Sequence, residues 1–422
     1  MDEQPQPHTT RFSRRRVLGA AGIAGAGLAV GAGVGQWREA NASPDQSTRS
    51  ATLAVSFFGS HQAGIATPVQ DRVVFAAFDV TTTKASDLRD MLDTWTAAAA
   101  SMAAGKQVAD TEAQPLAPPQ DTGEAVGLPA AQLTITIGFG PSLFDERFGL
   151  ASRRPAPLVE LPHFAGDQLD PQFSDGDICI QACANDPQVA FHAVRNLARL
   201  GRGTAAMRWL QLGFGRTSST STSQETPRNL LGFKDGTNNI KAEDASAMDQ
   251  YVWVGSGSGQ AWMTGGSYLV ARRITMRIET WDRDSLMDQE NVFGRVKLSG
   301  APIGSKQEFD TVDLAATAPD GLPLIPVDSH VRLAAPETNA GARILRRGYS
   351  FTDGISSVTG DLDAGLFFIC YQNDPEKQFV AIQKRLAAND ALNEYIVHTG
   401  SGIFACPGGV QAGSSWSDAL FA

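Results

Sequence analysis

Three short segments carry residue types that could bind a cofactor and act on a small substrate. The first spans residues 326–333 and reads as an extended stretch, in which period-2 alternation places Asp328, His330 and Arg332 on one side. Histidine is the commonest metal ligand among the side chains. An imidazole between an acid and a guanidinium could be an iron ligand beside propionate groups, but a solvated strand face is the competing interpretation.

The second segment is Gly-Phe-Lys-Asp-Gly-Thr-Asn-Asn, residues 232–239. An Asp-Gly pair such as Asp235-Gly236 is ordinarily a turn. The functional alternative is a carboxylate on a tight loop whose small neighbour, Gly236, leaves room for a flat cofactor and a small substrate.

The third segment, residues 344–350, contains the adjacent arginines Arg346 and Arg347. Adjacent arginines are commonly surface charges. In extended geometry Arg346 shares a face with Gly348 and so has space beside it, whereas Arg347 shares its face with Tyr349. Arg346 is therefore the preferred candidate for chemistry.

The remaining histidines and the cysteines give weaker signals. His61 and His398 stay open as alternative ligands, whereas His163, in a loop, and His192, in an apolar helix, fit structural roles. The cysteines form no C-x-x-C pair and have no neighbouring histidine at metal-ligand spacing. We predict that they are small buried apolar residues; they are Cys179, Cys183, Cys370 and Cys406.

The N-terminus resembles a twin-arginine export signal. Ser-Arg-Arg-Arg-Val-Leu at residues 13–18 leads into an uncharged stretch, residues 17–35, and small residues follow at 40–42. Alanine and glycine fill most of that stretch, which favours cleavage after Ala42 over retention as an anchor. The predicted destination is the periplasm, the cell envelope or the outside of the cell, and such export commonly carries proteins already loaded with a cofactor.

Composition limits the remaining function classes. The chain has 422 residues, of which 42% are hydrophobic, enough for one large or two medium cores. Its 35 basic and 45 acidic side chains give a net charge of −10. Without a basic cluster, nucleic acid is not an expected partner.

The elements that must position these segments repeat a β-α-β-β-α-β order. The first copy is predicted as strands 73–80, 133–138, 177–182 and 205–213, with helices at 85–104 and from 186. The second is predicted as strands 268–278, 344–351, 366–371 and 395–405, with helices at 281–295 and 375–386.

An internal match supports this duplication. Asn-Asp-Pro occurs at 185–187 and again at 373–375, where Asp can cap a helix and Pro can occupy its first turn. We therefore expect a signal at 1–42, a ferredoxin-like domain at 43–225 and a second one at 226–422. The Ser/Thr-rich residues 216–226 are expected to form an exposed linker between them.

Taken together, these motifs resemble dye-decolourising (DyP-type) haem peroxidases, in the exported subgroup described as deferrochelatase/peroxidase. The resemblance rests on residues 232–236, 328–334 and 346–350, and also on 61–68 and 281–295. It implies an α+β fold of duplicated ferredoxin-like domains, of the dimeric α+β barrel type, with one haem b in the C-terminal half.

The resemblance also implies roles for individual residues. His330 matches the iron ligand, and Glu394 matches the acid that hydrogen-bonds its other ring nitrogen. Asp235 matches the acid on the opposite side of the haem, and Arg346 the arginine there. Arg332 and Gly236 are predicted to contact the cofactor.

The implied activity is oxidation of dyes, phenols or other organic donors by hydrogen peroxide through a ferryl intermediate. Asp235 would carry the proton during O–O cleavage and Arg346 would stabilise the developing charge. Because a carboxylate has a reference pKa near 3.9, activity weighted towards acidic pH is expected. The alternatives are a deferrochelatase that releases iron from intact porphyrin and a non-catalytic haem carrier. Iron-uptake components and a second copy of the chain are further candidate partners.

Overall fold

The computed structural model describes residues 54–109, 115–257 and 259–421. The predicted export signal at 1–42 lies outside these residues. In the described part of the chain, no helix combines the length and the apolar character needed to cross a membrane.

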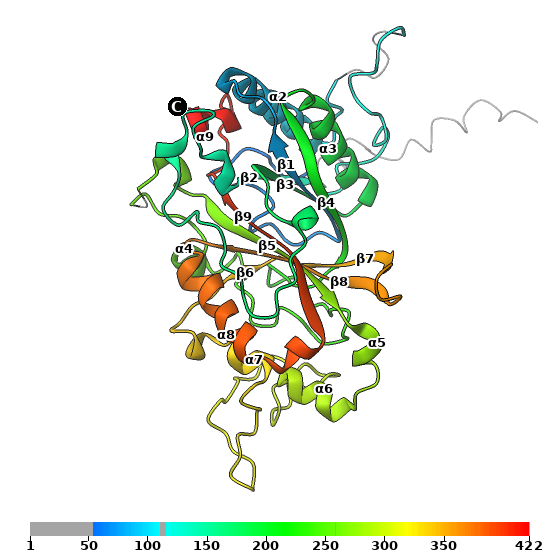
Figure 1. Cartoon of the computed structure of the whole chain (residues 1–422), viewed down its shortest axis with the longest axis vertical. Coiled ribbons are helices and arrows are strands. Elements are labelled where there is room, and N and C mark those ends of the chain that lie inside the picture. The colour runs from blue at the N-terminus through cyan, green and yellow to red at the C-terminus, as the bar shows by residue number, and fades with distance from the viewer. Residues whose placement is uncertain (1–53, 110–114, 258, 422) are drawn as a thin grey trace, which may run out of the picture. The chain divides into compact units, whose positions relative to one another are not determined.

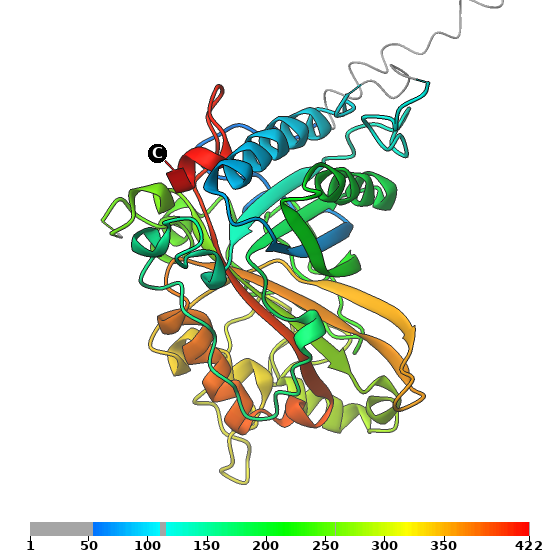
Figure 2. The same ribbon diagram turned by 45° about the horizontal axis from the view of Figure 1, so that its top comes forward.

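The first copy of the repeat forms a four-stranded antiparallel unit with two helices. Its strands lie in the order β4-β1-β3-β2, which is the ferredoxin-like order. In chain order the elements are β1 (Arg72–Val80), α2 (Ala85–Ala103), β2 (Thr134–Phe139), β3 (Ile178–Ala184), α3 (Pro187–Leu200) and β4 (Ala205–Arg216). Both helices lie on the outer side of these strands (Figure 2).

The second copy repeats this arrangement in the strand order β9-β5-β8-β7. Its strands are β5 (Ser267–Met276), β7 (Tyr349–Ile355), β8 (Leu362–Gln372) and β9 (Ile396–Cys406), with the short β6 (Leu345–Arg346) beside β8. Its helices are α5 (Ile278–Trp281), α6 (Leu286–Phe293), α7 (His330–Leu333) and α8 (Ala381–Asn389). A short α4 (Ala245–Tyr251) precedes β5, and α9 (Trp416–Phe421) follows β9.

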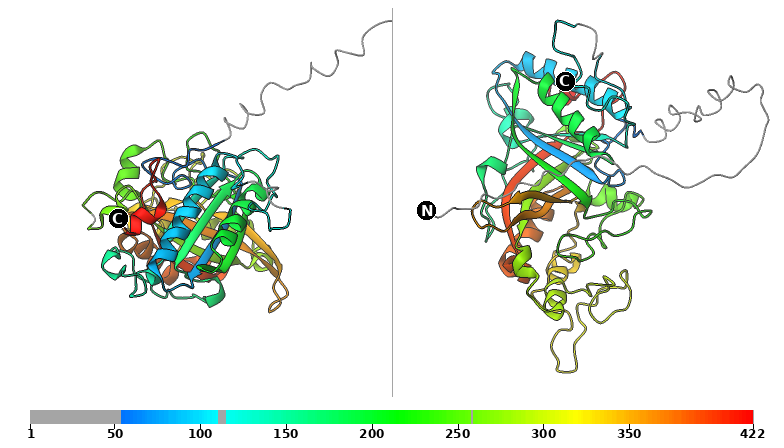
Figure 3. Two further views of the ribbon diagram at one scale, coloured as in Figure 1. Left: turned by 90° about the horizontal axis from the view of Figure 1, so that it is seen from above. Right: turned by 90° about the vertical axis from the view of Figure 1, so that its right-hand side faces the viewer.

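The two copies join along both edges. β2 pairs with β9 through Phe139 and Ala405, and β4 pairs with β7 through Phe214 and Ser350. Eight strands thereby close into one antiparallel barrel with helices outside it (Figures 1 and 3). The predicted α+β fold of two ferredoxin-like halves is confirmed.

Large aromatic side chains fill the inside of the barrel. Phe75, Phe367, Phe404 and Tyr371 are buried there in one apolar cluster. The four cysteines are free and buried, as predicted.

The repeated Asn-Asp-Pro motif acts as a helix start in the first copy. The Asp186 carboxylate accepts hydrogen bonds from the backbone N–H of Gln188 and Val189 at 2.7 and 3.3 Å, and Pro187 opens α3. In the second copy Asp374 accepts from the backbone of Lys377 at 3.2 Å, and a π-helical turn, Glu376–Val380, precedes α8.

Three local predictions were wrong. Residues 326–333 are not a strand, because α7 starts at His330 after the N-cap residue Ser329. The helix predicted at 281–295 is broken into α5 and α6, with a fresh N-cap at Ser285.

The third error is the exposed linker. Residues 217–221 are buried, because their hydroxyls find partners inside the protein. Ser218 Oγ accepts from the backbone N–H of Gly348 at 3.2 Å, and Thr220 Oγ1 donates to the carbonyl of Thr67 at 2.7 Å.

Candidate functional site

His330 is held by a buried carboxylate. Its Nδ1 lies 2.6 Å from Oδ2 of Asp390, whose side chain is only 2% exposed, whereas the imidazole is 31% exposed. The other oxygen of Asp390 accepts from the backbone of Leu392 at 2.9 Å, so the carboxylate is fixed on both sides. With Nδ1 engaged, Nε2 is the ring nitrogen left for a metal.

The electrostatics of His330 connect it to the other two motifs. Burial lowers the pKa of His330, but the charge and hydrogen bond of Asp390 outweigh burial and raise it. The charge of Asp235 also raises this pKa and that of Arg346 lowers it. Both side chains therefore lie within electrostatic reach of the imidazole.

Asp235 sits on an irregular loop, residues 226–239, whose backbone is fixed from within. The N–H of Asp235 donates to the carbonyl of Pro227 at 2.9 Å, and Asn229 Nδ2 donates to Asp235 Oδ2 at 3.3 Å. The other carboxylate oxygen, Oδ1, lies 2.7 Å from Nη1 of Arg346. Two motifs separated by 111 residues thus form one ion pair.

Asn239 aligns these two segments, and the sequence reading missed it. Its Oδ1 accepts from the backbone N–H of Arg346 at 2.8 Å, and its Nδ2 donates to the Arg346 carbonyl at 2.9 Å. This paired contact ties the loop that carries Asp235 to the strand that carries Arg346. The signal was present in the sequence as the last residue of the 232–239 motif.

Arg347 has a different environment from Arg346. It is fully buried and donates to the carbonyl of Thr67 and to Gln70 Oε1. The structure agrees with the preference for Arg346, since adjacent residues of a strand point to opposite sides.

Glu394 does not hold His330, so that prediction was wrong. Its side chain is exposed, and its backbone carbonyl accepts from Arg277 Nη1 at 3.0 Å. Asp390 takes the role because it caps the 3₁₀ turn Ala391–Glu394 at the end that faces α7. Position within that turn, which sequence does not show directly, decides between the two acids.

Arg332 and Gly236 have contacts within the chain, and their predicted contacts with the cofactor stay predictions. Arg332 donates from Nη2 to the carbonyl of Ile325 at 2.7 Å, which braces the chain entering α7. In a helix, residues two apart point in different directions, so His330 and Arg332 do not share a face. Gly236 has φ +87° and lies against the backbone of Ser218, so its small size serves the loop's own packing.

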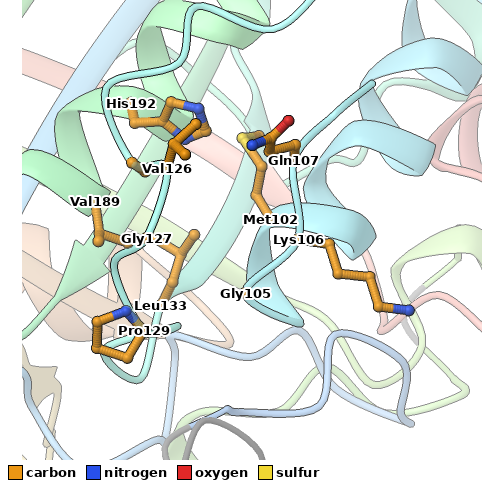
Figure 4. Close-up of a pocket in the computed structure, with 11 residues that line it drawn as sticks. Met102, Gly105, Lys106, Gln107, Val126, Gly127, Pro129, Leu133, Val189 and His192 are labelled. Carbon is orange, nitrogen blue, oxygen red and sulfur yellow. The ribbon is translucent and has the colours of Figure 1, made fainter. Parts of the chain in front are cut away.

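Three other histidines, His61, His192 and His398, have environments that fit structural roles. His61 stacks on Trp253 with ring centroids 3.9 Å apart, and burial together with Arg272 lowers the pKa of His398 to about 3. His192 lines a small separate cavity beneath the loop that follows α2 (Figure 4), where its Nε2 lies 2.9 Å from Asp121. Its predicted structural role is confirmed.

The chemistry available at His330 is that of a single ligand. Among the described residues, no group of three or more His, Cys, Asp or Glu side chains could hold a bare metal ion. A single histidine, with an acid and an arginine in reach, instead suits a metal whose other ligands come from a cofactor.

Comparison with known families decides the assignment. The N-terminal domain model of Dyp-type peroxidases matches residues 62–215, and the C-terminal domain model matches residues 226–411. The chain belongs to the Dyp-type peroxidase family.

Individual relatives agree with the family models. The chain is 40% identical over 417 residues to the deferrochelatase of Escherichia coli K12, covering 97% of this chain and 96% of that protein. It is 38% identical to the oxyferrous complex of DtpA from Streptomyces lividans, with a TM-score of 0.80 over 87% of this chain and 97% of that one. A DyP-type peroxidase from Cellulomonas bogoriensis is 37% identical, with a TM-score of 0.79 over 88% and 99% of the two chains.

Proposed function

We propose that this protein binds one haem b through His330 and uses it to reduce hydrogen peroxide at the expense of an organic donor. The observation that carries the proposal is the 2.7 Å pair of Asp235 and Arg346 within electrostatic reach of a histidine anchored by a buried acid. A haem carrier would have no use for that pair. The family assignment supports the same activity.

The residues present fit a haem. His330 offers Nε2 from a partly exposed ring, and Asp390 fixes the tautomer while making the imidazole a stronger donor. The 38%-identical DtpA has been solved in ferric and oxyferrous forms, which supports an iron cofactor. When bound, the haem supplies the iron that takes up peroxide and the redox chemistry of its cleavage.

The protein's own residues move the proton and stabilise charge. Asp235 Oδ1 is engaged by Arg346, so Oδ2, whose contact with Asn229 is longer at 3.3 Å, is the atom placed to accept a proton from peroxide. The same oxygen returns that proton to the departing oxygen, which then leaves as water. The guanidinium of Arg346 stabilises the negative charge that develops on the departing oxygen of peroxide.

Stopped-flow mixing of the haem-loaded protein with peroxide tests this assignment. Asp235→Asn keeps the shape but removes the base, and we expect the bimolecular rate constant to fall by about 10²–10⁴-fold. His330→Ala should lose the Soret absorption band, whereas His61→Ala and His398→Ala should retain it. An Asp235→Asn variant that reacts with peroxide at the wild-type rate would contradict the proposal.

Iron release from haem is the second candidate function, because the 40%-identical relatives are deferrochelatases. The same site would then serve iron uptake, together with other uptake components. Incubation of the haem-loaded protein with and without peroxide separates the two activities, with metal-free porphyrin and oxidised dye both assayed. Porphyrin release in the absence of dye turnover would favour the second function.

We further propose export by the twin-arginine route to the periplasm, cell envelope or cell exterior. The support is the arginine motif at 13–18 and the uncharged stretch at 17–35. Replacing Arg14 and Arg15 together by Lys should retain the protein inside the cell. N-terminal sequencing of the exported protein should begin at Ser43; export of the Lys variant at the wild-type level would contradict this route.

A further inference from the structure

A single carboxylate, that of Glu308, binds the loop that carries Asp235 on both sides of Asp235. Its Oε1 accepts from Thr237 Oγ1 at 3.0 Å, and its Oε2 accepts from Lys234 Nζ. Asp235 lies between two residues that share this one partner.

Glu308 is charged where it sits. Its residue surface is only 9% exposed. Burial raises the pKa of Glu308, but the hydrogen bonds from Lys234 and Thr237, together with the charge of Lys234, outweigh burial and lower it. Donors on both sides of Asp235 are therefore bound to a fixed negative charge.

Glu308 is itself anchored, so it can act as a support. It belongs to the long connection between α6 and α7, far from Asp235 in sequence. Its backbone carbonyl accepts from Arg295 Nη1 at 3.0 Å, and the same nitrogen donates to Gly300 at 2.7 Å. Arg228, on the Asp235 loop, donates across to the carbonyl of Lys297 at 2.7 Å. The two loops are thus bound together at several points.

The charges around this contact are mostly positive. Burial, Arg346 and Arg216 lower the pKa of Lys241, whereas the charges of Glu243 and Glu308 raise it. Arg295 experiences the same opposition between Arg346 and Glu308, in addition to burial. Asp235 itself faces Arg346 and, at longer range, His330, with Lys234 beside it in the chain. Glu308 is the buried carboxylate that offsets the ammonium group next to Asp235.

We propose that Glu308 is a positioning residue for peroxide cleavage: it fixes the Asp235 loop from both sides and neutralises Lys234. The inference rests on the proposed function, because it assigns Glu308 a role through Asp235. A purely structural role for Glu308 is the competing explanation.

The test compares Glu308→Gln with Asp310→Asn. The second variant makes the same charge change two residues away, at an exposed carboxylate that binds only the backbone of Lys306 and Gln307. Hydrogen exchange by mass spectrometry reports the loop independently of activity. We expect severalfold faster exchange in peptides covering residues 226–239 for Glu308→Gln alone.

The kinetic readouts are the peroxide rate constant and its pH profile in the haem-loaded protein. For Glu308→Gln we expect a loss of about tenfold or more, because the base is no longer held in line. The acid limb of the pH profile should move to lower pH, because the Lys234 ammonium group next to Asp235 then lacks its counter-charge. Asp310→Asn should leave both unchanged.

Each result either supports or overturns the inference. Glu308→Gln behaving like Asp310→Asn in exchange and kinetics would overturn it, as would faster exchange spread over the whole chain with an unmoved pH profile. Asp235→Asn serves as the reference: if it reacts at the wild-type rate the proposed function fails, whereas loss of activity in Asp235→Asn with none in Glu308→Gln removes only this inference.

Discussion

At the scale of single residues, the pair of His330 and Asp390 has a measurable signature in the cofactor-free protein. Asp390 raises the pKa of His330 in the folded state against the opposing effect of burial. A raised folded pKa stabilises the fold fully below the unfolded value of about 6.5, and the contribution disappears as pH rises through the folded value.

Asp390→Asn should therefore destabilise the cofactor-free protein more at about pH 5.5 than at about pH 9. The amide keeps the cap to Leu392 and removes only the charge. Urea denaturation at the two pH values measures the difference between the two losses of unfolding free energy. Glu394→Gln, at an exposed acid, is the control, and its loss of unfolding free energy should be the same at both pH values. An Asp390→Asn variant that is destabilised equally at both pH values would contradict the assignment.

The adjacent arginines should respond in opposite ways to the same substitution. Arg347→Leu leaves Gln70 and the Thr67 carbonyl without their buried donor, and should lower the free energy of unfolding by about 2–5 kcal/mol. Arg346→Leu should slow the reaction with peroxide by about 10²-fold or more at much smaller loss of stability. Denaturation measures the stability of both variants, and stopped-flow kinetics measures their reaction with peroxide. If Arg347→Leu slowed the reaction and Arg346→Leu mainly lowered stability, Arg347 would be the catalytic arginine and Arg346 the structural one.

Residue types and motifs were enough to select His330, Asp235 and Arg346 as candidates, because each predicted role requires a particular functional group, and the structure pairs Asp235 with Arg346. They were not enough for Asp390. Two acids four positions apart are chemically similar, and only the turn between them determines which one faces α7. The sequence therefore does not show which of the two acidic side chains is oriented towards His330.

At the scale of elements, the errors come from competing local signals. Alternating polarity at 326–333 favoured a strand, but a helical turn starts at His330, and the Ser329 hydroxyl before it donates to the Pro326 carbonyl at 2.8 Å. The Ser/Thr-rich residues 217–221 suited a linker by composition, whereas their hydroxyls are bound inside the protein. Hydrogen bonds decided the second of these segments, and they depend on tertiary partners.

The tight loop at Asp235 depends on Gly236 for a steric reason. Gly236 has φ +87°, and a Cβ there would lie 2.9 Å from the Ser218 Cα, which is backbone and cannot move aside easily. Gly232 has a similar φ of +84°, but its added Cβ would meet only the flexible end of Lys297. Gly232 is therefore a matched control for Gly236, because both have a positive φ and only Gly236 lies against backbone.

Gly236→Ala should lower stability by about 1–3 kcal/mol beyond the loss in Gly232→Ala, since only the first adds a backbone clash to the backbone strain. It should also slow peroxide cleavage, because Asp235 is its neighbour. Denaturation and peroxide kinetics on both variants measure this. Equal losses would show that strain alone, and not contact with Ser218, sets the requirement.

At the scale of the whole molecule, duplication was readable from the residues themselves, whereas the closed barrel was expected only from the family resemblance. The repeated Asn-Asp-Pro motif and element order predicted two similar halves. Joining them depends on the edge pairings of β2 with β9 and of β4 with β7. Edge strands carry no signal for their partner beyond suitable patterning, so one barrel and two separate sheets look alike in sequence.

A buried ion pair across the halves gives the last prediction. Arg272, on β5, pairs with Asp167, in the loop before β3, and both side chains are 1% exposed. The neighbouring backbone also joins the two halves, since the N–H of Gln168 donates to the carbonyl of His398 on β9 at 3.0 Å. A segment of the first half is thereby fastened to strands of the second.

Asp167→Asn leaves a buried guanidinium without its counter-charge and should lower the free energy of unfolding by about 3–5 kcal/mol. Replacing both partners, Asp167→Leu with Arg272→Met, should lose less than the sum of the single changes, because no charge is then stranded. Urea denaturation of the three variants measures the coupling. Since the halves share one barrel, every variant should unfold in a single transition; two separated transitions would mean that the halves are stable independently, and additive losses would mean that the pair does not couple them.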